Sequence, residues 1–238
     1  MKAVILAGGK GRRLAPYTTV LPKPLMPIGD IPILEVIIRQ LKQAGFDDLT
    51  MAVGYLAELL MAYFGDGSKL GVNIRYSREE HPLGTAGPLK LIDGLDEPFL
   101  LMNGDLLTTL DYRAMWDEHC LTNPIATLAT YQRDVQIDLG VIEIDHQQQV
   151  CGYVEKPTYH YTVSSGIYVF SPSVLEYIPY HKRMDLPDLI LKLLMAGHRV
   201  GAYPFAGRWL DIGRPDDYER AVSEFEQHRT EFLPLAPS

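Results

Sequence analysis

The chain has 238 residues, 47% of them hydrophobic and 22% charged, a balance typical of a globular protein with an ample core. Its formal net charge of −8 argues against a general nucleic-acid partner and favours a role with small molecules. Cys120 and Cys151 lie far apart, and no run approaches about 18 apolar residues, so we expect neither a disulfide scaffold nor a membrane partner. The N-terminus lacks a signal-peptide pattern, which predicts a cytoplasmic location.

A basic, glycine-rich loop follows the first apolar run of the chain. Residues 3–6 predict a buried strand, and the glycines within 8–11 let the backbone turn and bring its N–H groups close to a ligand. Every lysine and arginine within 2–23 precedes the first acidic residue, Asp30, so a cationic loop stands in an acidic chain. Such a loop is suited to hold an anion, and a solvated basic turn is the plain alternative.

Strand and helix patterns alternate after this loop. Apolar residues at helical spacing predict a helix over 33–44, and Gly45 stands where helices commonly end. We also expect a strand over 49–53, a helix over 55–64 and a strand over 72–76. This alternation predicts a largely parallel sheet, in which ligands bind beyond the carboxyl ends of the strands. The basic loop lies at such an end.

Two more turns have the composition of a ligand site. Residues 82–88 form a second glycine-rich turn that leads toward a helix ending near Ile92, and Thr85 is either a helix N-cap or part of a nucleotide contact. The apolar strand 99–102 ends in Asn103-Gly104-Asp105. Asp105 either turns the backbone locally or holds a divalent cation at the strand end.

The second half of the chain is more antiparallel, because residues 139–144 and 149–154 read as a hairpin. Glu155-Lys156-Pro157 follows this hairpin, either as an exposed ion pair or as a site for an anion. Asp211 is either a residue at the start of the last helix or a metal ligand. The remaining expected elements are helices over 114–121, 186–196 and 216–227 and strands over 125–131, 164–170 and 200–204.

No linker-like composition separates the two halves. We therefore predict a single domain over residues 1–231, followed by a tail over 232–238.

These segments together resemble the sugar-1-phosphate nucleotidyltransferases, the NDP-sugar pyrophosphorylases. Leu-Ala-Gly-Gly-x-Gly-x-Arg-Leu at 6–14 and Pro-Lys-Pro-Leu at 22–25 carry the resemblance, and Glu-Lys-Pro at 155–157 and Trp-x-Asp-x-Gly at 209–213 extend it. The resemblance implies an α/β, Rossmann-like fold of the GT-A type, with a mixed, mostly parallel sheet flanked by helices. A smaller antiparallel portion would bind the sugar. The chain looks most like short guanylyltransferases of mannose 1-phosphate or a heptose 1-phosphate without a β-helix domain.

The family's reaction transfers a nucleotidyl group from an NTP to a sugar 1-phosphate with Mg²⁺, giving NDP-sugar and pyrophosphate. The expected partners are these two substrates, and a second copy of the chain in a homodimer is a possible further partner. A uridylyl- or thymidylyltransferase acting on glucose or N-acetylmuramate 1-phosphate stays open, as does a catalytically silent regulatory subunit that binds nucleotide sugars. The chain departs from the family at Arg12, where Thr is usual, and at Ser164, where Asn is usual.

The resemblance assigns roles to individual residues. Arg13, Lys23, Asp105 and Lys156 are expected to act in catalysis, and Asp105 and Asp211 to hold the metal. Sugar-phosphate contacts are expected from Gly140, Glu155, Lys156, Ser165 and Trp209. Nucleotide contacts are expected from Leu6, Ala7, Gly8, Gly9, Gly11, Arg12, Arg13, Lys23, Glu80, Pro82, Gly84, Thr85, Asn103 and Gly104.

Overall fold

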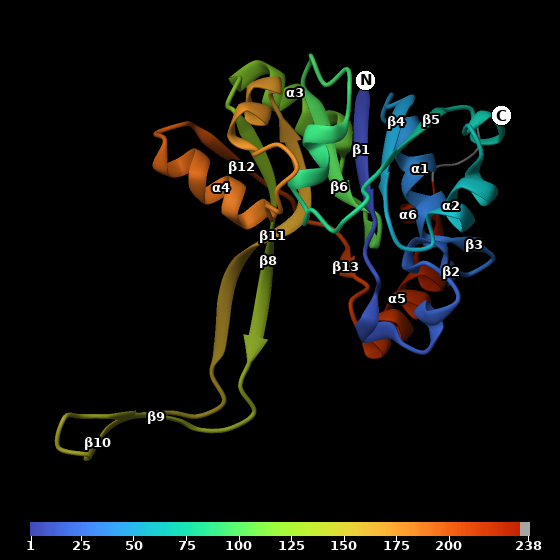
Figure 1. Ribbon diagram of the computed structural model, residues 1–238. Coiled ribbons are helices and arrows are strands. Elements are labelled where there is room, and N and C mark those ends of the chain that lie inside the picture. Colours follow the sequence, from blue (N-terminus) through green and yellow to red (C-terminus); the bar gives the residue numbers. More distant parts are fainter. Residues whose placement is uncertain (234–238) are drawn as a thin grey trace.

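The computed structural model describes residues 1–233 and is built around a seven-stranded sheet of order β12-β8-β11-β6-β1-β4-β5 (Figure 1). Within this sheet β11 pairs antiparallel with both of its neighbours, and every other pair is parallel. The expected mixed, mostly parallel sheet flanked by helices is therefore confirmed. Its strands are β1 (Lys2–Ala7), β4 (Asp48–Val53), β5 (Asn73–Arg78), β6 (Phe99–Asn103), β8 (Ala126–Gln136), β11 (Thr158–Phe170) and β12 (Val200–Pro204).

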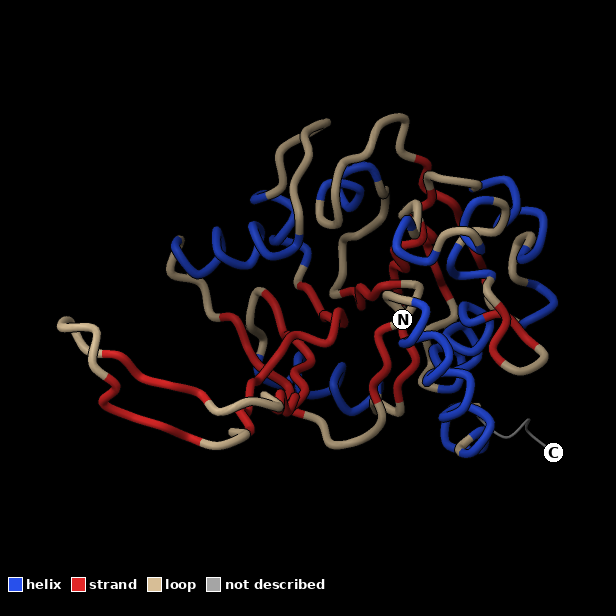
Figure 2. Tube along the Cα trace, turned by 90° about the horizontal axis from the view of Figure 1, so that it is seen from below, coloured by secondary structure: helices blue, strands red, loops and turns tan. Residues whose placement is uncertain are grey.

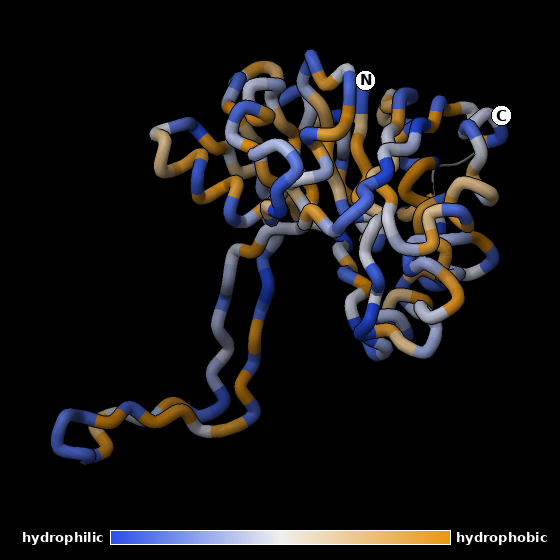
Figure 3. The backbone as a smooth tube through the Cα atoms, in the orientation of Figure 1, coloured by the Kyte–Doolittle hydropathy of each residue, from blue (hydrophilic) through white to orange (hydrophobic). Residues whose placement is uncertain are grey.

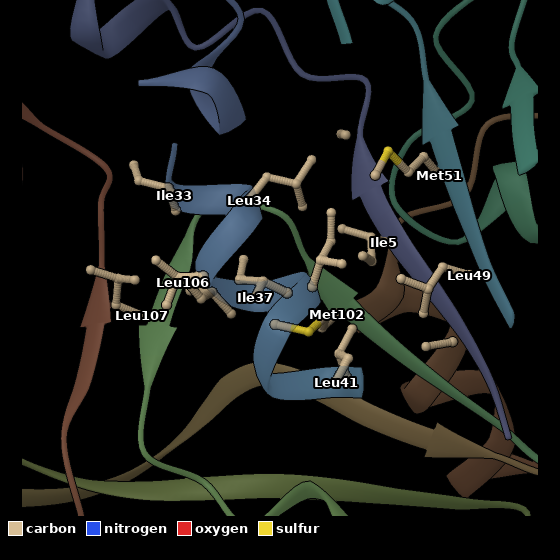
Figure 4. Packing of buried hydrophobic residues seen from close by; sticks show 14 of the residues in the cluster. Ile5, Ile33, Leu34, Ile37, Leu41, Leu49, Met51, Met102, Leu106 and Leu107 are labelled. Atoms are coloured by element: carbon tan, nitrogen blue, oxygen red, sulfur yellow. The ribbon is translucent and has the colours of Figure 1, made fainter. Parts of the chain in front are cut away.

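Both faces of the sheet are buried. Neighbouring residues along each strand point to opposite sides, so each strand contributes apolar side chains to both faces. Ile5 of β1 packs in one apolar cluster, and the adjacent Val4 packs in the other. Ile37 and Leu41 cover the first face beside Ile5 (Figure 4). The helices are α1 (Ile33–Gln43), α2 (Ala57–Phe64), α3 (Tyr112–Thr122), α4 (Leu186–Met195), α5 (Pro215–Gln227) and α6 (Arg229–Phe232).

Short elements join these layers. The helix expected to end near Ile92 is a 3-10 turn instead, η5 (Gly87–Leu91). The other 3-10 turns are η1 (Arg12–Leu14), η2 (Tyr17–Thr19), η3 (Lys23–Leu25), η4 (Ser68–Leu70) and η6 (Pro172–Tyr177). Small two-stranded ladders pair β2 (Pro27–Ile28) with β3 (Ile31–Pro32) and β7 (Leu106–Thr108) with β13 (Trp209–Asp211).

An arm leaves the sheet at the carboxyl edge of β6. Beyond residue 131, β8 pairs with β11 alone, and the two strands carry a terminal hairpin of β9 (Val141–Ile144) and β10 (Val150–Val154). We call residues 132–163 the arm. Figures 1 and 2 show it projecting away from the body of the protein in two perpendicular views. Both strands are longer than expected, because the residues that extend them, most of them exposed, pair with each other and not with the core.

The C-terminal boundary also differs from the expectation. The sequence predicts a tail that begins at 232, but the Phe232 side chain is fully buried and packs against Phe225 of α5. Of the predicted tail, residues 234–238 lie outside the described residues. In the described part of the chain, no helix is long and apolar enough to cross a membrane.

Candidate functional site

The basic loop turns directly beyond the end of β1. Gly11 has a φ of +58°, and a Cβ placed on it would lie 2.8 Å from Cγ2 of Thr18. The hydroxyl of Thr18 donates to the Gly11 carbonyl at 2.8 Å, and the N–H of Leu14 donates to the same oxygen at 2.9 Å. A left-handed backbone and a close neighbour both require glycine here. The loop is therefore folded by its own contacts, whereas a Cβ on nearby Gly9 would meet no atom of residues 1–233 within 4 Å.

Lys23 and Asp105 meet at the floor of this loop. Lys23 is 8% exposed, and its Nζ donates to Oδ2 of Asp105. The Lys23 side chain arrives on η3, and Asp105 follows β6, so two segments 82 residues apart converge at the carboxyl ends of adjacent strands β1 and β6. The strand-end rule accounts for this meeting.

Asp211 lies beside Asp105 because β13 pairs with β7. The ladder sets Asp211 opposite Leu106, and the N–H of Ile212 donates to the Asp105 carbonyl at 3.3 Å. Burial raises the pKa of Asp211 above its usual value, the neighbouring charge of Asp105 raises it further, and Lys23 and Arg13 lower it. Two carboxylates from distant segments thus lie close together, Asp105 half-buried and Asp211 exposed, and a divalent cation would relieve their repulsion.

A cavity of about 250 Å³ opens beside Asp105. Arg12 and Arg13 line it, and the guanidinium of Arg13 lies 3.4 Å from the Cβ position of Gly213. Arg12, the departure from the family pattern, therefore adds positive charge to the cavity wall. Gly213 was not among the expected contacts, although its place in Trp-x-Asp-x-Gly was a usable signal. The expected residues at this cavity are Leu6, Ala7, Gly9, Gly11, Arg12, Arg13, Lys23 and Asp105.

An adjoining cavity of about 1100 Å³ extends to the second glycine turn. Glu79 holds the two loops together: its Oε2 accepts the N–H of Leu83 at 2.8 Å, and its Oε1 lies close to Gly8 and Gly54. The wall thus has two neighbouring glutamates with different environments, since Glu80 also lines this cavity and has no hydrogen bond among the described residues. The expected residues at this cavity are Leu6, Gly8, Gly9, Gly11, Arg12, Glu80, Pro82, Gly84, Thr85, Asn103 and Asp105.

Thr85 has a structural contact as well as a place in the cavity. Its hydroxyl accepts the N–H of Leu186 at 2.7 Å, while its own N–H donates to Asp185 at 3.1 Å. It therefore caps the first turn of α4, a helix about one hundred residues further along the chain. Gly104 lies beneath the site, where its N–H donates to the Leu6 carbonyl at 2.9 Å.

Ser165 and Trp209 meet at the base of the arm. The hydroxyl of Ser165 donates to the Ala129 carbonyl at 2.9 Å, and the indole N–H of Trp209 donates to the Ser165 carbonyl at 2.9 Å. Ser165 is only 1% exposed. Its hydroxyl proton is donated within the sheet, and the expected sugar-phosphate contact of Ser165 stays a prediction. Trp209 supports the same junction, with its ring 5.5 Å from that of Tyr131.

Gly140, Glu155 and Lys156 are not brought to the cavities of their own chain. They lie where the outer strands of the arm meet its terminal hairpin, next to the bond from the Ile137 N–H to the Pro157 carbonyl. Neither of the two cavities described above is lined by a residue of the arm. The pairing of β8 with β11 carries these three residues outward, and their expected contact with the sugar phosphate stays a prediction.

Comparison with known proteins supports a single family. The family model described as Nucleotidyl transferase matches residues 2–228. A UTP–glucose-1-phosphate uridylyltransferase of Synechocystis is 36% identical, with 93% of this chain and 62% of the relative covered. A mannose-1-phosphate guanylyltransferase of Mycobacterium tuberculosis is 31% identical, with 93% and 64% covered. The chain thus spans a little under two thirds of the length of these curated relatives.

Solved structures share the fold over nearly the whole chain. A putative glucose-1-phosphate thymidylyltransferase of Bacillus anthracis, in complex with a sucrose, superimposes with a TM-score of 0.77 at 26% identity, covering 94% of each chain. HddC of Yersinia pseudotuberculosis gives a TM-score of 0.73 at 26% identity, covering 94% of this chain and 99% of that one. The GT-A-like architecture and the predicted resemblance are confirmed, and the chain belongs to the nucleotidyl transferase family.

Proposed function

We propose that the protein transfers a nucleotidyl group from an NTP to a sugar 1-phosphate, releasing pyrophosphate. The carrying observation is the group of Lys23, Asp105 and Asp211 beneath the basic glycine loop, at the carboxyl ends of β1 and β6. A phosphate monoester is itself a competent nucleophile, so the reaction needs alignment and charge neutralisation more than a general base. This arrangement supplies cations, backbone N–H groups and paired carboxylates in one partly closed place.

The basic residues divide the work along the phosphates. Arg12 and Arg13 line the smaller cavity and would bind the outer phosphates, so that Arg13 stabilises the departing pyrophosphate. Lys23 would hold the α-phosphate side. Its bond to Asp105 fixes the ammonium group at the floor of the cavity before substrate arrives.

Mg²⁺ is the cation that we propose for Asp105 and Asp211. The donor set fits it, because two carboxylates leave most of an octahedral shell to phosphate oxygens and water. The raised pKa of Asp211, caused by burial and by the neighbouring Asp105, is a second sign that the place favours added positive charge. When bound, the ion would neutralise phosphate charge in the transition state.

GTP with mannose 1-phosphate or a heptose 1-phosphate is the substrate pair that we propose. Glu80 lines the larger cavity, and its carboxylate could accept both N1–H and N2–H₂ of guanine, a pattern that uracil lacks. The guanylyltransferase relatives agree with this assignment. The uridylyltransferase relative supports UTP with glucose 1-phosphate as the alternative. A cytoplasmic location agrees with the exposed free thiols of Cys120 and Cys151.

Pyrophosphate release tests this proposal. The assay combines GTP, UTP, dTTP, ATP and CTP with a panel of sugar 1-phosphates in the presence of Mg²⁺. We expect a maximum with GTP and mannose or heptose 1-phosphate, and a loss of at least about 100-fold in kcat for Asp105→Asn. Asp96→Asn is the matched control, because Asp96 also pairs with a lysine, Lys2, but on the surface.

Two results would contradict the proposal. Wild-type turnover in the Asp105→Asn variant would show that the carboxylate of Asp105 takes no part in the reaction. Nucleotide binding without pyrophosphate release from any substrate pair would favour a regulatory subunit. A maximum with UTP or dTTP would keep the reaction and replace the proposed base.

A further inference from the structure

We propose that two copies of this chain exchange arms, so that each cleft receives Glu155 and Lys156 from the other copy. The catalytic half of this inference rests on the proposed function. The association itself rests on the arm alone, through an apolar face of its hairpin and the position of its two charged residues.

One face of the terminal hairpin consists of large apolar side chains. The ladder pairs Ile144 with Val150 and Ile142 with Tyr153, and directly paired residues project to the same side. Ile142 and Ile144 are two positions apart on β9, so all four side chains share one face. They are exposed by 50% (Ile142), 59% (Ile144), 65% (Val150) and 62% (Tyr153). A contiguous apolar face of this kind marks an interaction surface.

The arm cannot cover this face by itself. A two-stranded ribbon is marginally stable in water and needs a third strand or a packing partner. The hairpin pairs with no third strand among residues 1–233, and Figure 3 shows apolar segments in the terminal hairpin. Leu139, at the start of the hairpin, is 73% exposed and extends the apolar surface toward the bend.

The bend between arm and hairpin is built in a specific way. The Tyr153 ring occupies the space that a Cβ on Gly140 would need. The Tyr153 hydroxyl in turn donates to Oε2 of Glu155 at 2.8 Å. Lys156 has a φ of +45°, a strained conformation for a residue with a side chain. Strain of this kind is found at functional sites, yet neither cavity of the candidate site reaches the bend.

The length of the arm excludes its own cleft in this conformation. Strand β11 runs extended from Thr158 to Ser164 at the sheet edge, a span of about 20 Å at 3.3 Å per residue, and Lys156 lies before its start, further out on the arm. The arm leaves the sheet beside Asn103, since a Cβ on Gly166 would meet the Asn103 amide. It therefore passes the rim of the cleft and continues beyond it.

A second copy of the chain would both cover the apolar face of the hairpin and receive Glu155 and Lys156 in its cleft. An apolar, nearly uncharged face is self-complementary about a two-fold axis, because the same patch on each subunit can cover the other. The same axis that lets one arm reach a neighbouring cleft returns the neighbour's arm. Each cleft would then gain the cation for the sugar phosphate, from Lys156, and a hydrogen-bond acceptor for sugar hydroxyls, from Glu155.

Complementation between two inactive variants tests the exchange. Lys156→Ala has an intact cleft and a defective arm, and Asp105→Asn has the reverse. The two chains are co-expressed with different tags, and the mixed dimer is isolated by both tags. Arm exchange joins an intact cleft to an intact arm once in each mixed dimer, so we expect about half of the wild-type turnover per dimer. Each variant alone should stay near background.

A mixed dimer at background, with active wild type and inactive Lys156→Ala, would overturn the inference, because the arm would then serve its own cleft. Full activity of Lys156→Ala would overturn it as well. If wild type releases no pyrophosphate from any substrate pair, the proposed function fails, and the association is judged separately by the oligomeric state.

Light scattering measures the oligomeric state without any substrate. We expect wild type at twice the mass of one chain and Ile142→Glu at the mass of a single chain with an unchanged melting temperature. Leu121→Glu is the control, since this residue at the end of α3 is 86% exposed and lies outside the arm. A monomeric wild type, or an Ile142→Glu protein that stays dimeric, would overturn the association.

Discussion

Replacing Gly11 and Gly9 by alanine should separate the folding of the phosphate loop from its binding function. Both glycines line the smaller cavity, so a motif comparison treats them alike. Their surroundings in the described part of the chain differ. A Cβ on Gly11 would lie 2.8 Å from Cγ2 of Thr18 and 3.5 Å from Cβ of Lys23, whereas a Cβ on Gly9 would meet nothing within 4 Å.

The expected loss for Gly11→Ala has two parts. A left-handed conformation costs a non-glycine residue about 1–2 kcal/mol, and overpacking adds about 1–3 kcal/mol. We therefore expect the free energy of unfolding to fall by about 2–5 kcal/mol. Gly9→Ala should stay within about 1 kcal/mol of wild type, because the added methyl group enters open space. That space is the expected path of the phosphates, so Gly9→Ala should weaken nucleotide binding.

Thr18→Ser distinguishes the two parts of the Gly11→Ala loss. Serine keeps the hydroxyl that donates to the Gly11 carbonyl and removes the methyl group that the new Cβ would strike. In the double variant the stability lost to overpacking should be regained, while the backbone loss of about 1–2 kcal/mol remains. Urea unfolding measures wild type, the three single variants and the double variant, and calorimetric titration with GTP measures binding. An equal loss of stability in Gly9→Ala and Gly11→Ala, or no recovery with Thr18→Ser, would refute this reasoning.

Two further predictions concern groups away from the phosphates. His119 is buried beside Thr127, and burial lowers its pKa from 6.5 to about 4. Between these values the unfolded chain binds a proton that the folded chain does not, so lowering the pH from 7 to 5 should reduce the free energy of unfolding by about 2 kcal/mol. His119→Gln should flatten this dependence in urea titrations, and an equally steep curve would exclude His119 as its source. Thr85→Ala should cost about 1 kcal/mol without nucleotide, because the hydroxyl caps α4 at Leu186, while Thr85→Ser should cost little. Equal stability of the two variants would leave the cap without a measurable contribution.

Local signals were sufficient for much of the cleft. The basic loop and Asp105 follow apolar strands directly, and parallel strands bring their carboxyl ends to one edge, so β1 and β6 had to place them close together. The neighbourhood of Asp211 depends on β7 and β13, which pair over three residues. So short a ladder leaves no periodicity to detect, and only the family resemblance pointed to it.

Side-chain roles were harder to predict than positions. The glycine turn at 82–88 lines the larger cavity, but the partner of Thr85 is Leu186, which no local pattern could indicate. Ser165 shows the same limit: its strand was predicted, yet its hydroxyl donates to Ala129 on the neighbouring β8. A hydrogen bond across strands depends on register, and register is a property of the sheet.

The placement of the arm relative to the cleft could not be predicted from the sequence of a single chain. Its hairpin was predicted correctly, because alternation and turn residues depend only on near neighbours. Whether that hairpin lies over its own cleft or reaches a neighbour's changes none of these patterns, since the same apolar face must be covered in either case. What differs is the partner of Ile142 and Tyr153, and a second copy of the chain offers an identical face for them. Glu-Lys-Pro can therefore follow the family pattern in sequence while lying outside its own cleft, with one chain supplying the phosphate loop and the other the lysine.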